Sequence, residues 1–440
     1  MDENELMGSM KVSKAVAKMA IPSVISSLVT VVYNMADTFF VGQTGDPLQV
    51  AAVSQTNPIF ILFMAFANMF GMGGSAAASM ALGEKKEKRV KQVSSFITYA
   101  SLIVGIVFAV ILLVGMQPVL QLFGADADTY ELAKGYTTYI SYGAPFIIWS
   151  AAASFVVRSD GASREAMTGS MIGTVANIIL DPIFISGFGM GAAAIATTIG
   201  NIMASVYYLW YFCRKSRNMS MAFRYFKCGD RILSQVCSAG LPTAIFSALM
   251  SISTIILNQI LVAYGNAPVA AIGIVFKANM FITFLQMGLA NGVQPLLGYS
   301  YGAGNRERFI TVERYTKKCC LIVGVLATAL FFFFREPIIH LFISDTEVIN
   351  YGVEMLIAYM ISGPVIGILF MNMNCMQSTG NALPATILSI LRQGVLLIPV
   401  LYGLNALLGL HGVIYGQALT DYVAVLLSIV IWRWKRRKTL

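Results

Sequence analysis

The sequence predicts an all-α polytopic membrane protein, with twelve transmembrane helices in two six-helix lobes related by a pseudo-two-fold axis along the membrane normal. Three observations predict this fold class: long apolar runs, basic residues gathered on one side, and an internal repeat. Of the 440 residues, 57% are hydrophobic and only 12% are charged, about half the charged share of a soluble domain. The alternation of a β-barrel strand is absent, so helices are the elements left that can cross lipid.

Apolar runs separated by glycine, proline and charged residues predict the helices in order. Each run has the length that a helix needs to cross a hydrocarbon core of about 30 Å. We expect helices near residues 14–43, 52–82, 92–116, 131–157, 165–186, 192–213, 232–263, 269–300, 315–334, 350–377, 384–407 and 412–434. The first ten residues are acidic and polar, and the first apolar run is too long for a signal peptide, so no cleavable leader is expected.

The basic residues predict the orientation of these helices. With the N-terminus inside, 26 of the 30 Lys and Arg fall in inside segments. Lys134 and Arg335 fall in outside loops, and Lys277 and Arg392 fall within helices. This asymmetry follows the positive-inside rule, so we expect a bacterial cytoplasmic membrane protein with both termini in the cytoplasm. The net charge of +9 then reflects topology, and no nucleic-acid partner is expected.

The two halves of the chain resemble each other at a shift of about 219 residues. Pro22 recurs as Pro242, and Pro145 recurs as Pro364. Each half has six spans, so both enter the membrane in the same direction, as in two-lobed transporters with alternating access. The alternative is a repeat that serves helix packing alone. We expect an N-lobe at 1–213, a cytoplasmic linker at 214–231 and a C-lobe at 232–440.

Two carboxylates in the first half are the sharpest functional signal. A charge at the bilayer centre costs about 2.5–3.5 kcal/mol, which makes such residues functional candidates. Asp37 follows Tyr33 by four residues, and Asp181 follows Asn177 by four, so each carboxylate shares a helix face with a neutral oxygen donor. The two faces together could bind Na⁺, or a proton on a desolvated carboxylate. The alternative is that both Asp lie near helix ends and face headgroup water.

The second half lacks this pair and carries other polar groups. Lys277, Arg392 and Asp421 could contact substrate or relay charge, or Asp421 could form a structural ion pair with one of the two cations. Helices of this half also carry an amide cluster that could line a substrate cavity or bond across helices. Its members are Gln286, Asn291, Gln294, Asn372, Asn374 and Gln377.

The sequence also resembles a known family, most clearly in its N-terminal half. Pro22, the stretch Tyr33–Gly42 and the following Gly45-Asp46 resemble helix 1 of the multidrug and toxic compound extrusion (MATE) transporters, and Asn177…Asp181-Pro182 resembles helix 5. The resemblance covers essentially the whole chain and is strongest with the bacterial DinF- and MepA-like branch. It implies a V-shaped fold and antiport of drugs, often cationic and amphipathic, against Na⁺ or H⁺.

The resemblance also implies a cation site and one departure from the family pattern. The cation site would comprise Asp37, Asn177 and Asp181, with Tyr33 beside them and Thr197 as the best match for a helix 6 threonine. Some relatives carry acidic residues in helices 7 and 10 of the second lobe. Here helix 7 has none, and Glu354 near the outer end is the only acid of helix 10, which puts a second cation site in doubt.

The expected function is therefore a secondary active antiporter that exports cationic or amphipathic compounds in exchange for Na⁺ or H⁺. We expect no cofactor, no metal beyond Na⁺ at Asp37 and Asp181, and a monomer that contacts small organic substrates and membrane lipid. A weaker prediction places Gln286, Asn291, Gln294, Asn374, Lys277 and Arg392 in the substrate cavity. The alternatives are a lipid-linked oligosaccharide flippase, which should carry several mid-membrane Arg, a membrane enzyme, for which no catalytic constellation is evident, and a channel.

Overall fold

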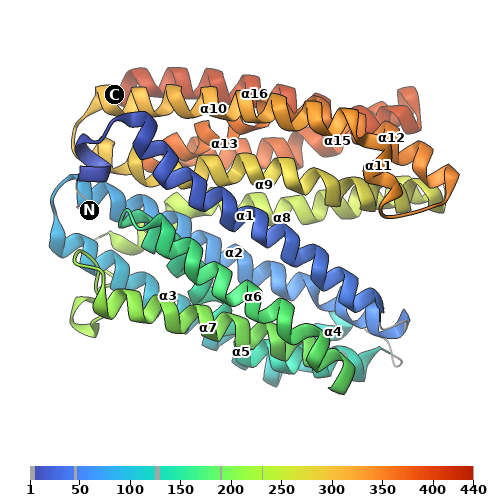
Figure 1. Cartoon of the computed structure of the whole chain (residues 1–440), viewed down its shortest axis with the longest axis horizontal. Helices are drawn as coiled ribbons and strands as arrows, with labels where there is room; N and C mark the ends of the chain where they lie inside the picture. Colours follow the sequence, from blue (N-terminus) through green and yellow to red (C-terminus); the bar gives the residue numbers. More distant parts are fainter. Residues whose placement is uncertain (1–4, 44–46, 124–128, 189–190, 230, 440) are drawn as a thin grey trace.

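The computed structural model describes residues 5–43, 47–123, 129–188, 191–229 and 231–439. Side chains at 37–43, 47–51, 53–54, 186–188 and 191–192 lie outside this description. Across the described ranges every regular element is a helix. The elements form two groups that converge at the end where both termini lie (Figure 1).

The first lobe contains six long helices. They are α1 (Val12–Gln43), α2 (Pro47–Gly83), α3 (Glu87–Val114), α5 (Tyr130–Ser159), α6 (Ser163–Phe188) and α7 (Gly191–Arg214). A short π-helical turn, η1 (Glu5–Ser9), precedes α1, and a short helix, α4 (Met116–Leu122), follows α3. The sequence prediction missed both short elements, because neither is long enough to produce an apolar run of membrane-spanning length.

The second lobe repeats this order with two interrupted spans. Its helices are α8 (Ile232–Val262), α9 (Asn266–Gly302), α10 (Arg306–Phe333), α11 (Arg335–His340), α12 (Thr346–Ile361), α13 (Gly363–Ser378), α14 (Ala382–Ile390), α15 (Leu397–Leu408) and α16 (Leu410–Thr439). α12 and α13 form one span bent by 46° at Ser362, and the π-helical turn η3 (Leu391–Leu396) joins α14 to α15. A 3₁₀ turn, η2 (Phe223–Tyr225), lies in the linker between the lobes.

The predicted fold class is confirmed. Ten helical segments among the described residues are long and apolar enough to cross a membrane, and the bent α12–α13 pair adds an eleventh. α7, with 24 residues, is the remaining long helix of the first lobe. The predicted start of the ninth span, near residue 315, is too late because α10 begins at Arg306, so the first two turns of this helix carry basic residues that the prediction placed in a loop.

The backbone confirms the internal repeat at the predicted shift. Both ends of α3 and α10 are offset by 219 residues. The tight turns recur as well: Gly161 and Gly380 have φ of 85° and 74°, and Lys85 and Gly304 have φ of 59° and 69°. Left-handed backbone is costly for a residue with a Cβ, so its recurrence at matched positions reflects a shared turn geometry.

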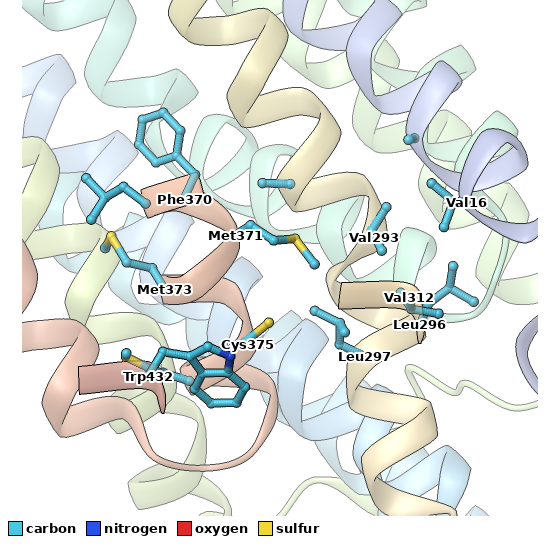
Figure 2. Close-up of a cluster of buried hydrophobic side chains, with 14 of the residues drawn as sticks. Val16, Val293, Leu296, Leu297, Val312, Phe370, Met371, Met373, Cys375 and Trp432 are labelled. Atoms are coloured by element: carbon cyan, nitrogen blue, oxygen red, sulfur yellow. The ribbon is translucent and has the colours of Figure 1, made fainter. Parts of the chain in front are cut away.

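Each lobe packs the beginning of the other lobe's first helix into its own core. Val16 and Met19 of α1 join the second lobe's core beside Val293 and Phe370, part of which Figure 2 shows. Conversely, Val236 of α8 joins the first lobe's core. Because α8 is the repeat of α1, a two-fold relation between the lobes requires both helices to pack against the other lobe in the same way.

The lobes approach each other backbone to backbone at several glycines. A Cβ on Gly73 would lie 1.9 Å from the carbonyl oxygen of Val236, and one on Gly240 would lie 1.8 Å from that of Met69. Nearer the termini, a Cβ on Gly83 would meet the Tyr299 carbonyl at 2.2 Å. Backbone-to-backbone contact of this kind is how small residues let membrane helices approach. These contacts close the molecule at the terminal end.

The linker is tied to the first lobe through Asp160, which caps α5. This buried carboxylate accepts hydrogen bonds from Tyr211 (2.8 Å), Ser216 (2.7 Å) and Asn218 (2.9 Å). Burial raises the pKa of Asp160, while these three hydrogen bonds lower it. Desolvation outweighs the hydrogen bonds in their effect on this pKa, and the hydrogen bonds from Ser216 and Asn218 fix the start of the linker against α5.

Candidate cation site and the polar interiors of the two lobes

The candidate site of the first lobe is built on a close approach of α6 and α7. A Cβ on Gly200 would lie 2.5 Å from the Gly173 carbonyl oxygen and 3.3 Å from the Asn177 Cβ. Two glycines facing each other therefore bring the two helix backbones together. This approach brings polar side chains that lie one helical turn from each glycine within hydrogen-bonding distance of each other.

Asn177, Asp181 and Thr197 form a buried polar cluster, and each is at most 5% exposed. In the amide orientation that satisfies both of its polar atoms, Asn177 donates to the Asp181 carboxylate at 2.8 Å. The amide oxygen of Asn177 then accepts from the Thr197 hydroxyl at 3.1 Å and from the Thr197 backbone N–H at 2.9 Å. The structure thus brings together three of the five predicted residues, with Asp181 next to neutral groups.

Two further residues, which the sequence did not single out, extend this cluster toward α5. Asn201 donates to the Thr197 carbonyl oxygen at 2.8 Å, and Ser150 donates to the Asn201 side chain at 2.9 Å. The spacing of Thr197 and Asn201, four residues apart on α7, was the available signal. A hydrogen-bonded line therefore runs from Asp181 through α7 to α5.

The α1 side of the predicted site is described only in part. α1 packs against α6, and Tyr33 is half-buried on α1. Asp37 belongs to the helical part of α1, but its side chain lies outside the described residues. Within the described part of the chain, no three His, Cys, Asp or Glu side chains gather as metal ligands would.

The second lobe uses neutral amides that bond across helices. Gln286, fully buried on α9, donates to the carbonyl oxygens of Cys320 (3.0 Å) and Gly363 (3.2 Å). Asn374 donates to Asn291 at 3.0 Å. The remaining bonds run from Gln294 to Gln377 (3.5 Å), from Gln377 to Thr243 (3.1 Å) and from Asn372 to Ser428 (2.9 Å). These contacts connect α9 with α10 and α13, α13 with α8, and α13 with α16.

Two buried charges of the second lobe form an ion pair, which is one of the two alternatives that the sequence predicted. Arg392 donates to Asp421 at 2.8 Å, and Gln417 donates to the same carboxylate oxygen at 3.0 Å. The Arg392 guanidinium lies 5.2 Å from the Phe246 ring and 5.8 Å from the Phe370 ring, within cation–π range. Asp421 is therefore already neutralised by a charge within the lobe.

The Arg392 pair coincides with the π-helical turn η3. The hydroxyl of Ser253 on α8 donates to the backbone oxygen of Gln393 in that turn. A π turn widens the helix and often marks a functional position. Gly173 occupies the position of the first lobe that matches Arg392, and there α6 and α7 approach each other through small residues. Lys277 is half-buried on α9, and the structure records no ion pair for it among the described residues.

Comparison with known proteins gives one consistent result. The sequence model of the MatE family matches residues 22–183 and 242–402, once in each half. The multidrug export protein MepA of Staphylococcus saprophyticus is 32% identical over 422 residues, which cover 96% of this chain and 93% of that protein. MepA of Staphylococcus aureus gives the same identity and coverage. A multidrug resistance MATE family transporter of the MOP superfamily, solved in an outward-facing conformation, has a TM-score of 0.93 at 25% identity and covers 99% of this chain and 98% of its own.

Proposed function

The chain belongs to the MATE family, and on that premise we propose that it is a multidrug efflux antiporter that exports cationic or amphipathic organic compounds in exchange for Na⁺ or H⁺. The observation that carries this proposal is the buried cluster of Asn177, Asp181 and Thr197, which has no counterpart in the other lobe. The export of drugs is supported by the 32% identity to MepA over nearly the whole length of both chains. Efflux of this kind requires no cofactor and no covalent chemistry.

We place the coupling ion at Asp37, Asn177, Asp181, Thr197 and Tyr33. The chemistry of these donors suits Na⁺, which prefers oxygen ligands, and equally suits a proton held by a desolvated carboxylate. Binding of either ion neutralises carboxylate charge on α1 and α6, which are packed against each other. This neutralisation changes how α1 packs on α6 and disfavours the drug-bound outward state, so that substrate is released.

The driving force available from one ion can be estimated. One cation that moves down a membrane potential of about 100 mV supplies about 2.3 kcal/mol. At about 1.4 kcal/mol per decade, this sustains roughly a fifty-fold gradient of a neutral substrate. One coupling site in one lobe is therefore enough for a neutral amphipathic substrate, whereas one-for-one exchange with a monovalent cationic substrate moves no net charge and is driven by the concentration gradient of the coupling ion.

We place the substrate between the lobes. Asn291 and Lys277 are both half-buried on α9, which suits them to contact a ligand in that space. Gln286, Gln294, Asn374 and Arg392 are buried and would shape the same wall from within the lobe. A flippase is disfavoured, because Arg392 is neutralised by Asp421 and does not contribute a free cation to a cavity.

We infer that the terminal end of the molecule faces the cytoplasm of a bacterial cell and that the chain works as a monomer. The basic residues gather at this end, as the positive-inside rule requires. Because the lobes touch at the terminal end, this orientation makes the structure outward-facing. The high TM-score to an outward-facing MATE transporter supports this interpretation.

The decisive experiment is ethidium efflux from proteoliposomes under separately imposed Na⁺ and pH gradients. We expect Asp181→Asn and Asp37→Asn each to abolish ion-driven efflux. The matched control is Glu354→Gln, which removes a half-buried carboxylate of the second lobe that contacts His411 and lies outside the proposed substrate wall, and it should retain coupling. Full ion-driven efflux by both single variants would refute the proposal.

A further inference from the structure

A basic pocket opens on the outside of the second lobe, near the terminal end. It has a volume of about 360 Å³ and is lined by residues of α10, α13 and α16. Its charged lining residues are Glu313, Arg314, Lys317, Arg433 and Arg436, and its apolar ones are Ile368, Ile429 and Trp432. α10 and α16 overlap along one edge of the view in Figure 1, and the side chains of Trp432 and Arg436 on α16 connect to Glu313 on α10 near the C-terminus.

A single buried carboxylate organises the pocket. Glu313 is 2% exposed and contacts Lys317 at 2.5 Å, the Trp432 indole nitrogen at 2.7 Å and Arg436 at 3.4 Å. It neutralises only one of the four cations. Arg314 and Arg433 are exposed, and the structure records no ion pair for either of them within its described ranges. The pocket thus carries a net charge of +3 and presents two guanidinium groups to a ligand.

The floor of the pocket is rigid and apolar. Trp432 is 1% exposed and belongs to the lobe core together with Cys375 and Met373, as Figure 2 shows. Its ring lies 6.1 Å from that of Phe309. Ile368 and Ile429 continue the apolar lining. A ligand that fits must therefore be anionic at one end and apolar at the other.

The repeat shows what such a surface holds in the other lobe. Ser94, Ser95 and Tyr99 on α3 stand at the positions of Glu313, Arg314 and Lys318 on α10. There the linker between the lobes crosses α3: Ser94 donates to the Ser220 carbonyl oxygen at 3.0 Å and Ser95 donates to that of Ala222 at 3.1 Å.

Two further contacts fasten the linker to this surface. Tyr99 donates to the Met221 carbonyl oxygen at 3.0 Å, and the rings of Phe96 and Phe226 stack at 6.3 Å. In the second lobe the segment that matches the start of the linker is the C-terminal part of α16, and its Arg436 contacts Glu313 at 3.4 Å. Arg314 and Arg433 remain exposed beside this contact.

We propose that the basic pocket binds one anionic phospholipid, with its phosphate at Arg314 and Arg433 and an acyl chain along Ile368 and Ile429. Guanidinium groups bind phosphate through paired, charge-assisted hydrogen bonds, which suits two exposed Arg better than two Lys. Basic pockets between transmembrane helices near the membrane surface are suited to anionic headgroups.

The test is native mass spectrometry of the full-length protein in detergent, titrated with phosphatidylglycerol or with phosphatidylcholine. We expect one phosphatidylglycerol to bind more tightly than any phosphatidylcholine. Arg314→Gln/Arg433→Gln should weaken that binding roughly thirtyfold, from the interaction expected of two basic side chains with an anionic lipid. The matched control is Lys88→Gln/Arg217→Gln, which removes two exposed cations from the first lobe at the same end and should leave binding unchanged.

Every other outcome overturns the proposal. Equal binding of the two lipids, or an equal loss in the pocket and control variants, would show a non-specific electrostatic attraction. Full competition by inorganic phosphate at matched ionic strength would show a site for a free anion. A variant whose only tryptophan is Trp432 adds a local readout, because brominated phosphatidylglycerol should quench its fluorescence and brominated phosphatidylcholine should not.

Discussion

In the first lobe, Asp181 lies beside the neutral side chains of Asn177 and Thr197, whereas in the second lobe Asp421 lies beside the guanidinium of Arg392. The two lobes share helix order, turn geometry and a first helix whose beginning packs into the other lobe. They differ in how a buried carboxylate is balanced. A cation that enters the second lobe must displace Arg392 from Asp421, while Asp181 of the first lobe accepts a hydrogen bond from the neutral amide of Asn177. The same frame thus yields one lobe suited to ion binding and one suited to a fixed structure.

The largest effect that tests this contrast is expected at Arg392. Arg392→Gln leaves Asp421 buried with only the Gln417 hydrogen bond, and an uncompensated buried charge costs about 3–5 kcal/mol. We expect a large drop in the thermal unfolding midpoint in detergent. Asp421→Asn/Arg392→Gln should recover most of that loss. If the double variant is no more stable than the single one, the pair does not act as a unit.

The next largest effect is expected where the lobes touch. Gly73→Ala introduces a Cβ into space occupied by the Val236 carbonyl oxygen, and overpacking of this kind costs about 1–3 kcal/mol. We expect the terminal end to open, which can be measured as increased distances between spin labels on the two lobes. Gly273→Ala is the control, since no atom lies within 4 Å of the added Cβ. Unchanged distances in the Gly73 variant would contradict closure through backbone contact.

A smaller effect is expected at Thr197. Thr197→Val keeps the side-chain shape and removes the hydroxyl that donates to Asn177, at a cost of about 0.5–1.5 kcal/mol, or up to about tenfold in ion affinity. The half-maximal Na⁺ or H⁺ concentration for efflux should rise accordingly. Thr243→Val removes a hydroxyl that accepts a hydrogen bond from Gln377 in the second lobe, and it should leave the half-maximal ion concentration unchanged. Equal shifts in both variants would erase the proposed difference between the lobes.

The smallest effect is expected at the linker. Ser94→Ala removes a hydroxyl that holds Ser220, which should cost about 1 kcal/mol. Limited proteolysis within residues 214–231 should accelerate by roughly fivefold, while the efflux rate stays unchanged. A slower efflux rate would show that the linker takes part in transport.

Much of the fold could be predicted from sequence because lipid imposes strong rules. Runs of apolar residues indicated the spans, while the direction that the positions of Lys and Arg indicate stays a prediction. The bend at Ser362 lies directly before Gly363-Pro364, so the local sequence carried a signal for it that the prediction of one continuous span did not use. The π turn at Leu391–Leu396 contains neither proline nor a charge pattern that would have predicted it. The register of the repeat could be predicted, since prolines and glycines mark the same turns in both halves.

The candidate site was predictable in part. The i, i+4 spacing of Asn177 and Asp181 indicated a shared helix face, and the family resemblance supplied Thr197. The approach of Gly173 to Gly200, which brings α6 and α7 together, depends on which helices are neighbours, and a single sequence does not reveal that. For the same reason the sequence left open whether Asp421 pairs with Lys277 or Arg392.

The most direct test of the central claim is the number of coupling ions bound by purified protein without substrate. Radioactive Na⁺ binding and proton uptake after a pH jump would be measured for wild type, Asp181→Asn and Asp421→Asn/Arg392→Gln. We predict saturable uptake of one of these ions by wild type and by the second-lobe double variant, and none by Asp181→Asn. Uptake that persists in Asp181→Asn but disappears in the double variant would contradict the assignment of ion coupling to the first lobe.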